Sequence, residues 1–454
     1  MNTPISKTAP GGKMVNAFNP ATAEGLSKET RELVERRTRL LGPAYRLFYQ
    51  NPVEISRGRG VLLWDSQGNE YLDAYNNVVS VGHCHPRVVN AVNAQMQRLC
   101  THTRYLQDGI LRYAEQLLAT FGGTIGATGH AMFTCTGSEA NDLALRIAQH
   151  HTGRRGVIVT EEAYHGNSHL TAGLSPSLGS KSPLGTWVRQ VMAPDSYRVD
   201  PLKLGELMAQ DVEEKIADLE RHGDGLAAFM VDSMFSSDGI YGHPTDLLAP
   251  VAEVVRRSGG LFIADEVQSG FGRTGEKLWG YQRHNIDPDI ITMGKPMGNG
   301  FPVAGIAIAP KFAASFGNDM RYFNTFGGNT VAIAAAQATL DVIVEENLLE
   351  NCNKVGQLIQ AGIRELSEKH ELIGDVRGSG LYIGVELVSD RTKKSPNAAA
   401  AAAIVNALRE RRVLISATGF HANTLKIRPP LVFGESHATR LLTELEVVLT
   451  NLKK

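Results

Sequence analysis

The sequence is short of the features that mark a membrane-spanning, secreted or disulfide-stabilised protein. Its 454 residues contain four scattered cysteines, and without a CxxC pair this set indicates a reducing compartment rather than a disulfide framework. No apolar run reaches the ~18–20 residues that a membrane helix needs. The N-terminus also lacks the charged-then-apolar profile of a secretory signal. We therefore expect a cytoplasmic protein that does not contact membranes.

The sequence also lacks an excess of positive or negative charge. The chain has 46 basic and 47 acidic residues, and its formal net charge is −1. This balance does not favour nucleic acid or an anionic surface as a partner. Two imidazoles and a thiol lie together at His83, Cys84 and His85, but no further ligand cluster joins them. We therefore expect an ordinary loop there and no bound metal.

From about residue 110 to 310 the sequence alternates regularly between two kinds of segment. Short apolar or β-branched runs are separated by stretches with helical periodicity, of which 246–257 is one. This alternation predicts a mostly parallel sheet covered by helices. The predicted strands are 157–159, 229–231, 261–263, 290–292 and 303–308.

The ends of the chain have a different pattern. Residues 1–25 are rich in Gly, Pro and Asn and predict a loose arm, 26–42 a helix, and 60–73 a hairpin with its turn at 65–69. A long helical stretch at about 330–370 is followed by mixed strands and helices. We therefore predict an α/β protein with a large domain, whose mostly parallel central sheet is flanked by helices, and a smaller α+β domain. The chain length fits more than one lobe, and we assign 1–70 to the arm and part of the small domain, 71–335 to the large domain and 336–454 to the C-terminal small domain.

Two charged residues lie at the ends of neighbouring apolar runs in the predicted sheet. Lys295 follows the run that starts at Ile290, and Asp265 ends the run before it. Because the carboxyl ends of parallel strands meet at one edge, the two side chains can converge. This pairing suits an aldehyde cofactor with a ring nitrogen. The lysine would form a Schiff base with the aldehyde, and the carboxylate would keep the ring nitrogen protonated.

A second candidate site begins at Thr136. Thr136 and Glu139 have the spacing of a capping box, and apolar residues follow on one helical face, so a helix should start here. Gly137 allows close backbone approach, Ser138 adds a hydroxyl donor, and the free amides of the helix start would complete a phosphate cup. Taken alone, the motif fits an ordinary capped helix at least as well.

Two further segments admit either a functional or a structural interpretation. Tyr164 and His165 follow a predicted strand, and an aromatic ring there could stack on a planar cofactor or simply pack under a loop. Thr325 lies in a polar, glycine-rich turn before a helix, at 322–329. That turn could supply a second phosphate ligand or be only a turn.

Together these segments resemble the class III aminotransferases, a family of fold-type I pyridoxal phosphate enzymes. The resemblance runs from about residue 40 to 450 and is strongest over 261–275 and 289–300. It implies that Lys295 binds the cofactor and acts as the proton-transfer base, and that Asp265 pairs with the pyridinium nitrogen. The implied cofactor-binding set is Thr136, Gly137, Ser138, Tyr164, His165, Asp232, Asp265, Val267, Gln268, Lys295 and Thr325.

The resemblance also assigns positions within that set. Val267 would lie under the cofactor ring, Tyr164 on its opposite face, and Gln268 at the ring hydroxyl. Gly137 and Ser138 would hold the phosphate, with Thr325 reaching in from the other subunit. A homodimer with active sites at the subunit interface is therefore implied.

The outcome of the reaction depends on segments in which family members differ. In many aminotransferases a glutamate masks the arginine that binds the substrate carboxylate. That arginine aligns with Arg428, and the glutamate aligns with Ser237, which cannot mask it. The neighbouring Asp238 could mask Arg428 instead. Several segments, among them 75–86, 193–198 and 372–388, more closely resemble the ethanolamine-phosphate and phosphohydroxylysine phospho-lyases. Asp232 in place of the usual glutamate, and Arg428 in place of a frequent lysine, depart from that branch.

The resulting hypothesis is a phospho-lyase acting on a small phosphorylated amine such as phosphoethanolamine. The alternative is an aminotransferase that moves an amino group from a small amine or amino acid to pyruvate or another 2-oxo acid. The candidates to bind the substrate are Asn77, Arg104 and Arg428, and for Arg104 a structural salt bridge is an equal alternative. A protein that retains the cofactor but not the chemistry is the remaining alternative, and the presence of Lys295 and Asp265 argues against it.

Overall fold

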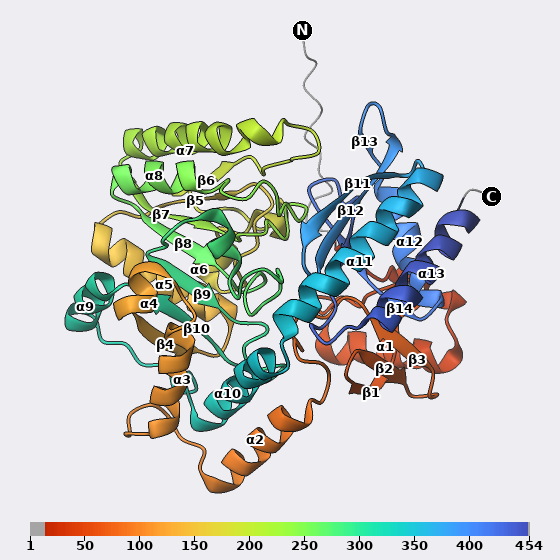
Figure 1. Cartoon of the computed structure of the whole chain (residues 1–454), viewed down its shortest axis with the longest axis horizontal. Coiled ribbons are helices and arrows are strands. Elements are labelled where there is room, and N and C mark those ends of the chain that lie inside the picture. Colours follow the sequence, from red (N-terminus) through yellow and green to blue (C-terminus); the bar gives the residue numbers. More distant parts are fainter. Residues whose placement is uncertain (1–13, 453–454) are drawn as a thin grey trace.

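The computed structural model describes residues 14–452 and contains a seven-stranded sheet that organises one half of the molecule (Figure 1). Its order is β4-β10-β9-β8-β7-β5-β6, and all adjacent pairs are parallel except those made by β10. The predicted α/β fold with a mostly parallel central sheet is confirmed. The strands are β4 (His130–Thr134), β5 (Gly156–Thr160), β6 (Val188–Val191), β7 (Leu226–Val231), β8 (Leu261–Asp265), β9 (Ile290–Met293) and β10 (Ala304–Ile308).

The middle strands explain why this sheet is covered on both faces. Every residue of β5, β7, β8, β9 and β10 is buried, as expected of near-continuous apolar strands in a parallel sheet. Helix α5 contacts β7, β9 and β10, whereas α7 and α8 contact each other and the strands β6–β8. The helices of this half are α3 (Asp108–Leu118), α4 (Gly123–Thr128), α5 (Gly137–Thr152), α6 (His169–Ala172), α7 (Leu204–Arg221), α8 (Ala249–Ser258) and α9 (Pro310–Asp319).

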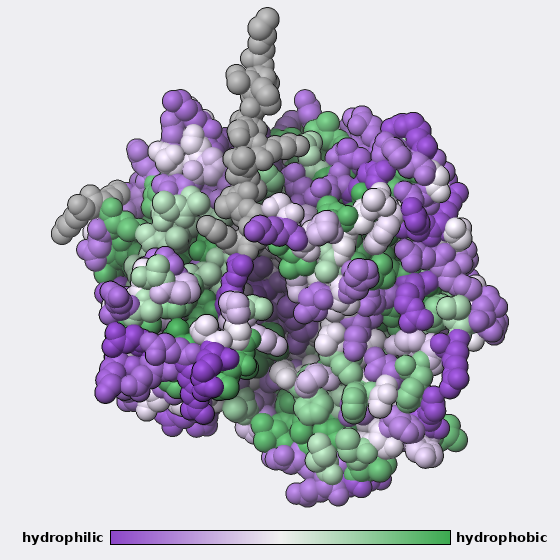
Figure 2. Space-filling model, turned by 180° about the vertical axis from the view of Figure 1, so that it is seen from behind, coloured by the Kyte–Doolittle hydropathy of each residue, from purple (hydrophilic) through white to green (hydrophobic). Residues whose placement is uncertain are grey.

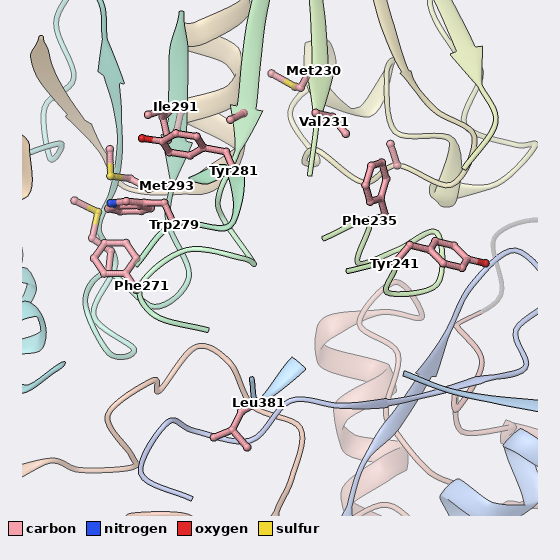
Figure 3. Packing of buried hydrophobic residues seen from close by; sticks show 14 of the residues in the cluster. Met230, Val231, Phe235, Tyr241, Phe271, Trp279, Tyr281, Ile291, Met293 and Leu381 are labelled. Carbon is pink, nitrogen blue, oxygen red and sulfur yellow. The ribbon is translucent and has the colours of Figure 1, made fainter. Parts of the chain in front are cut away.

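Aromatic side chains fill the space next to the carboxyl edge of the sheet. Trp279 and Phe271 are fully buried, and their rings meet edge to face with centroids 4.9 Å apart. Figure 3 shows both close to Met293, the last residue of β9. Packed aromatic rings of this kind contribute through both buried area and ring geometry. They give the loops that follow β8 and β9 a rigid support.

Two smaller sheets occupy the other half of the molecule (Figure 1). One has the order β1-β2-β3-β14, and the other contains β11-β12-β16-β15 with β13 paired to β12. The predicted hairpin at 60–73 is present as β2 and β3. The strands are β1 (Ile55–Arg59), β2 (Leu62–Asp65), β3 (Glu70–Asp73), β11 (Ile373–Ser379), β12 (Tyr382–Asp390), β13 (Ser395–Pro396), β14 (Val413–Leu414), β15 (Ser416–Thr418) and β16 (Thr424–Ile427).

The remaining helices cover these sheets and connect the two halves. They are α1 (Lys28–Leu41), α2 (Pro86–Arg98), α10 (Thr330–Glu345), α11 (Leu348–Lys369), α12 (Ala398–Glu410) and α13 (Glu435–Asn451). Strand β14 pairs with β3 in parallel, so the N-terminal and C-terminal segments share a sheet. The paired residues of β3 are Leu72 and Asp73, so we propose that the small lobe comprises about 14–73 and 336–452, slightly beyond the predicted boundary at 70, and the large lobe about 74–335. No helix within residues 14–452 is both long and apolar enough to span a membrane.

Three local predictions need correction. The helical stretch at 330–370 is two helices, because Asn347 takes a left-handed conformation with φ 51° and breaks the helix. The helix predicted from residue 246 begins at Ala249, where Pro250 fits the first turn. The arm predicted for 1–25 is not loose over 14–25, since buried Asn16 accepts a backbone hydrogen bond from Tyr49 at 2.7 Å. Residues 1–13 of that arm lie outside the described part.

Candidate active site

A pocket of about 180 Å³ opens at the carboxyl edge of the central sheet. Asp265 ends β8 and pairs in register with Thr292 of β9, three residues before Lys295, so the predicted convergence of the two charged residues is present. The pocket contains all the predicted cofactor-binding residues except Thr136 and Thr325, together with two that were not predicted. It is lined by Gly137, Ser138, Asn141, Tyr164, His165, Gly166, Asp232, Asp265, Val267, Gln268 and Lys295.

Asp265 is held in place by three donors. It accepts hydrogen bonds from His165 Nδ1 at 2.6 Å, Asn141 Nδ2 at 2.9 Å and the Val267 backbone at 3.0 Å. Burial alone would raise the pKa of Asp265, but the hydrogen bond and charge of His165 and the Val267 amide lower it below its usual value. The carboxylate therefore stays ionised and can hold a proton on a basic ring nitrogen.

Lys295 has an amine that is easier to deprotonate than an ordinary lysine. Burial and the nearby Arg428 guanidinium lower the pKa of Lys295 to about 8, against the opposing effects of Asp265 and Asp232. A neutral amine is the nucleophilic form. The pocket thus prepares Lys295 for attack on an aldehyde.

The start of α5, where a phosphate cup was predicted, lies at the pocket. Thr136 caps the helix by accepting from the Glu139 amide at 3.1 Å, so its hydroxyl is used in the cap and lies outside the pocket. The first amides of a helix have no partner within the helix, and here they belong to Gly137 and Ser138. A Cβ at Gly137 would meet Val267 at 2.9 Å, so glycine is what lets this backbone approach the pocket.

Two pocket residues were missed by the sequence analysis. Gly166 has φ 144°, and a Cβ there would lie 2.6 Å from Ser138 Oγ. Asn141 lies one helical turn after Gly137 and donates to Asp265. Its only signal in the sequence was a short amide one helical turn after Gly137 and next to the apolar face, because its burial is visible only in the structure.

Arg428 and Gln268 are joined at the edge of the pocket. Arg428 Nη1 donates to Gln268 Oε1, and its Nε donates to the Tyr75 carbonyl at 3.2 Å. Asp238, the possible masking partner, instead accepts from Thr160 Oγ1 at 2.8 Å and from the Glu162 amide. The alternative in which Asp238 masks Arg428 is therefore not observed, because donors on β5 and in the following loop bind both oxygens of Asp238.

Lys426 is a buried lysine that was not predicted. Thr424 and Lys426 lie on one face of β16, Arg428 continues the same alternation directly after the strand, and this spacing was the missed signal. Lys426 Nζ donates to the Ser236 carbonyl at 3.1 Å. It lines a larger cleft of about 1490 Å³, together with Phe48, Tyr75 and residues of α7, and Figure 2 shows the molecule hollowed between its halves.

Besides Thr136 and Arg428, three further predicted residues do not line the pocket in this chain. Thr325 and Arg104 are exposed, and the Arg104 guanidinium lies 3.8 Å from the centre of the Phe323 ring. Within residues 14–452 Arg104 has no acidic partner, so of the predicted alternatives a salt bridge inside the chain is not observed, and a salt bridge to a second subunit stays a prediction. Asn77 is buried, and its Nδ2 has no hydrogen-bond partner in the described part of the chain.

The residues at 83–85 form ordinary contacts. His83 Nε2 bonds to Asp73 Oδ2 at 2.7 Å, and His85 lies 3.3 Å from Glu346. Within the residues that the structure describes, no group of three His, Cys, Asp or Glu side chains could hold a metal ion.

Comparison with known proteins places these features in a family. The model of the class III aminotransferases matches residues 47–449. A protein of Caenorhabditis elegans named ethanolamine-phosphate phospho-lyase homolog 1 is 40% identical, over 96% of this chain and 96% of its own. An alanine–glyoxylate aminotransferase 2-like protein of Drosophila melanogaster is 38% identical, over 95% of this chain and 89% of its own.

Solved structures give the same picture of the fold. A phospholyase from Arthrobacter in complex with phosphoethanolamine superimposes with a TM-score of 0.88 and 42% identity, covering 92% of this chain and 99% of its own. An aminotransferase of Bacillus anthracis superimposes with a TM-score of 0.85 and 28% identity, covering 94% of this chain and 99% of its own.

Proposed function

The chain belongs to the class III aminotransferase family of pyridoxal phosphate enzymes, and from this premise we propose that it is a phospho-lyase. Its substrate would be a small phosphorylated amine such as phosphoethanolamine, converted with one water into acetaldehyde, phosphate and ammonia. The observation that carries the proposal is a second buried lysine next to the pocket: Lys426 Nζ donates to the Ser236 carbonyl at 3.1 Å, and the Ser236 amide donates to the pocket residue Asp232 at 3.2 Å. Two of the four relatives named above support it, the phospho-lyase homolog and the phospholyase in complex with phosphoethanolamine.

The pocket residues fit the cofactor. His165 Nε2 is buried without a partner in the described chain, and the glycine at 137 leaves the space that a Cβ would fill. When bound, pyridoxal phosphate supplies an electron sink for the pair left when a proton leaves the carbon next to the substrate nitrogen. Asp265 would hold the ring nitrogen protonated, Gly137 and Ser138 would bind the phosphate, and Tyr164 and Val267 would enclose the ring. The Lys295 amine would take the proton from the substrate carbon.

The low pKa of Lys295 makes the uptake of the cofactor sensitive to pH. If the cofactor-free protein is mixed with pyridoxal phosphate, we expect the visible absorbance to form about tenfold faster for each pH unit up to 7. Because the pKa of Lys295 is lowered to about 8, the rate should then level off above that value. A rate that continues to climb to pH 10, as with free Nα-acetyl-lysine measured alongside, would contradict this.

Lys426 is suited to receive the leaving phosphate. An ammonium has three donors, and the Ser236 carbonyl takes one of them. Burial and the neighbouring Arg428 lower the pKa of Lys426 well below its usual value, although Asp232 acts in the opposite direction. A phosphate dianion beside Lys426 would favour the charged form again. The same anion is a good leaving group once a cation binds it, which favours elimination.

Product analysis tests this function. We expect the purified enzyme to release phosphate, acetaldehyde and ammonia from phosphoethanolamine in equal amounts. Lys426→Met should lower kcat/KM for this substrate about 10- to 100-fold, the loss of one or two charged hydrogen bonds, and Lys426→Arg should retain more activity. The visible spectrum of the bound cofactor serves as the control for an intact pocket. Robust amino transfer from small amines to pyruvate without phosphate release would establish the aminotransferase alternative instead.

We further propose a homodimer in the cytoplasm. Large hydrophobic side chains are exposed on and after α2, on α3, and in the turn that contains Thr325: Val89, Met96, Leu99, Leu106, Leu111 and Phe326. Figure 2 shows hydrophobic residues at the lower end of the molecule, the end at which Figure 1 shows α2. An apolar surface of this kind suits a subunit interface. Arg104 and Thr325 lie on the same surface. In a dimer each would serve its predicted role in the active site of the other subunit.

All four cysteines are free, in keeping with a reducing compartment.

A further inference from the structure

Gln268 is fixed by two donors that come from the smaller lobe. Its Oε1 accepts from Arg428 Nη1 and from the Tyr382 hydroxyl at 3.2 Å. Tyr382 begins β12 and Arg428 follows β16, and the register of these strands pairs Ile383 with Ile427. The two donors therefore stand opposite each other at neighbouring strand ends. Both are buried, with exposures of 0% for Tyr382 and 6% for Arg428.

The chemistry of Arg428 determines which way the Gln268 amide points. The oxygen and nitrogen of an amide are nearly indistinguishable by shape, but a guanidinium has only donors. The atom of Gln268 that faces Arg428 must therefore be the oxygen. The nitrogen is then directed elsewhere, and it has no hydrogen-bond partner within residues 14–452. Because Gln268 lines the cofactor pocket, its NH₂ group is available to an acceptor there.

Arg428 itself has little freedom to turn away. Its Nε donates to the Tyr75 carbonyl, and its guanidinium lies 4.6 Å from the centre of the Tyr75 ring. Two of its donor groups are thus used by neutral acceptors of the protein. This arrangement suits a support for Gln268 better than a receptor for a mobile substrate.

We propose that Arg428 is a positioning residue that acts through Gln268. Together with Tyr382 it holds the Gln268 amide with its NH₂ group toward the pocket, as a donor to the ring oxygen of pyridoxal phosphate. A hydrogen bond to the ionised ring oxygen stabilises that form. The small lobe thereby controls where the proton shared between the ring oxygen and the nitrogen of Lys295 resides. The proposal depends on the cofactor and not on the leaving group of the substrate.

The visible absorbance of the cofactor-loaded enzyme, titrated with pH, reports on that shared proton. We expect Gln268→Leu and Arg428→Met each to raise the midpoint of the titration by about one pH unit, since the donor to the ring oxygen is lost. Tyr382→Phe, which removes a donor without removing a charge, should raise it less. Arg428→Lys, which retains a donor, should shift the midpoint less than Arg428→Met.

A double-mutant cycle separates positioning from a simple effect of charge. If Arg428 acts through Gln268, Arg428→Met should cause no further shift in a Gln268→Leu background. An equal shift in both backgrounds would show that the charge acts on its own and would overturn the proposal. An unchanged midpoint in Arg428→Met, with only KM for the phosphorylated amine raised, would overturn it too. Should Arg428→Met fail to fold by circular dichroism, Tyr382→Phe and the same cycle carry the test. The phosphate assay is independent, so either proposal can fail alone.

Discussion

Replacing Lys295 with alanine is expected to lower turnover at least about 1000-fold, the largest effect of any single substitution in this protein. The variant would lose both the covalent anchor of the cofactor and the base that takes the substrate proton, and proton transfer by a positioned side chain alone is worth about 10²–10⁴-fold. Turnover is measured under saturating pyridoxal phosphate, so that weaker cofactor binding does not account for the loss. Treatment with borohydride followed by mass analysis should label the wild type at Lys295 and leave the variant unlabelled.

An exposed lysine provides the control for this experiment. Lys354 forms a surface ion pair with Glu435 at 2.6 Å, and Lys354→Ala should retain the turnover and the label of the wild type. A Lys295→Ala enzyme with the turnover of the wild type would remove the basis for its assignment. So would a wild-type protein that stays colourless after incubation with the cofactor.

Asp265→Asn is expected to lower turnover about 100- to 1000-fold, the range found when one preorganised electrostatic group is removed. The amide has nearly the shape of the carboxylate but lacks its charge, so a proton on the ring nitrogen would lose its counter-ion. His165 and Asn141 would also face the asparagine amide, which has one acceptor oxygen where the carboxylate has two. The loss should be in kcat more than in KM, because the charge is needed when the substrate proton leaves.

Asp289 offers a matched control on the same sheet. It lies directly before β9, at the end of the strand away from the pocket, and accepts from the Phe262 amide at 2.9 Å. Asp289→Asn should affect thermal stability but leave kcat within about twofold, since it touches only the backbone of a neighbouring strand. If both variants lost turnover equally, the defect would be one of folding, and Asp265 would have no special role.

The convergence of Lys295 and Asp265 could be predicted from the sequence because it follows from short-range rules. Buried runs of β-branched residues form parallel strands, and their carboxyl ends meet at one edge. The same holds for the helix start at Thr136, where capping residues and an apolar face are local features of the chain.

Predictions failed where several elements had to be placed relative to one another. Asp238 is adjacent in sequence to Ser237, yet it bonds to Thr160 of β5 and not to Arg428. The break at Asn347 lies within an otherwise unbroken helical pattern and depends on how α10 and α11 pack. Such contacts join residues far apart in the chain, and their geometry is set by packing rather than by local propensity.

The residues alone predicted the α/β class, the convergence of Lys295 and Asp265, and the start of a helix after Thr136, because each depends on spacing along a strand or helix. Only the folded chain showed that Asn141 donates to Asp265, that Lys426 donates to the Ser236 carbonyl next to the pocket, and that Arg428 donates to Gln268. These three contacts bring together different elements, two of them across the junction of the lobes. A hydrogen bond forms only when distance and direction both fit, and for residues so far apart in sequence the tertiary structure sets both.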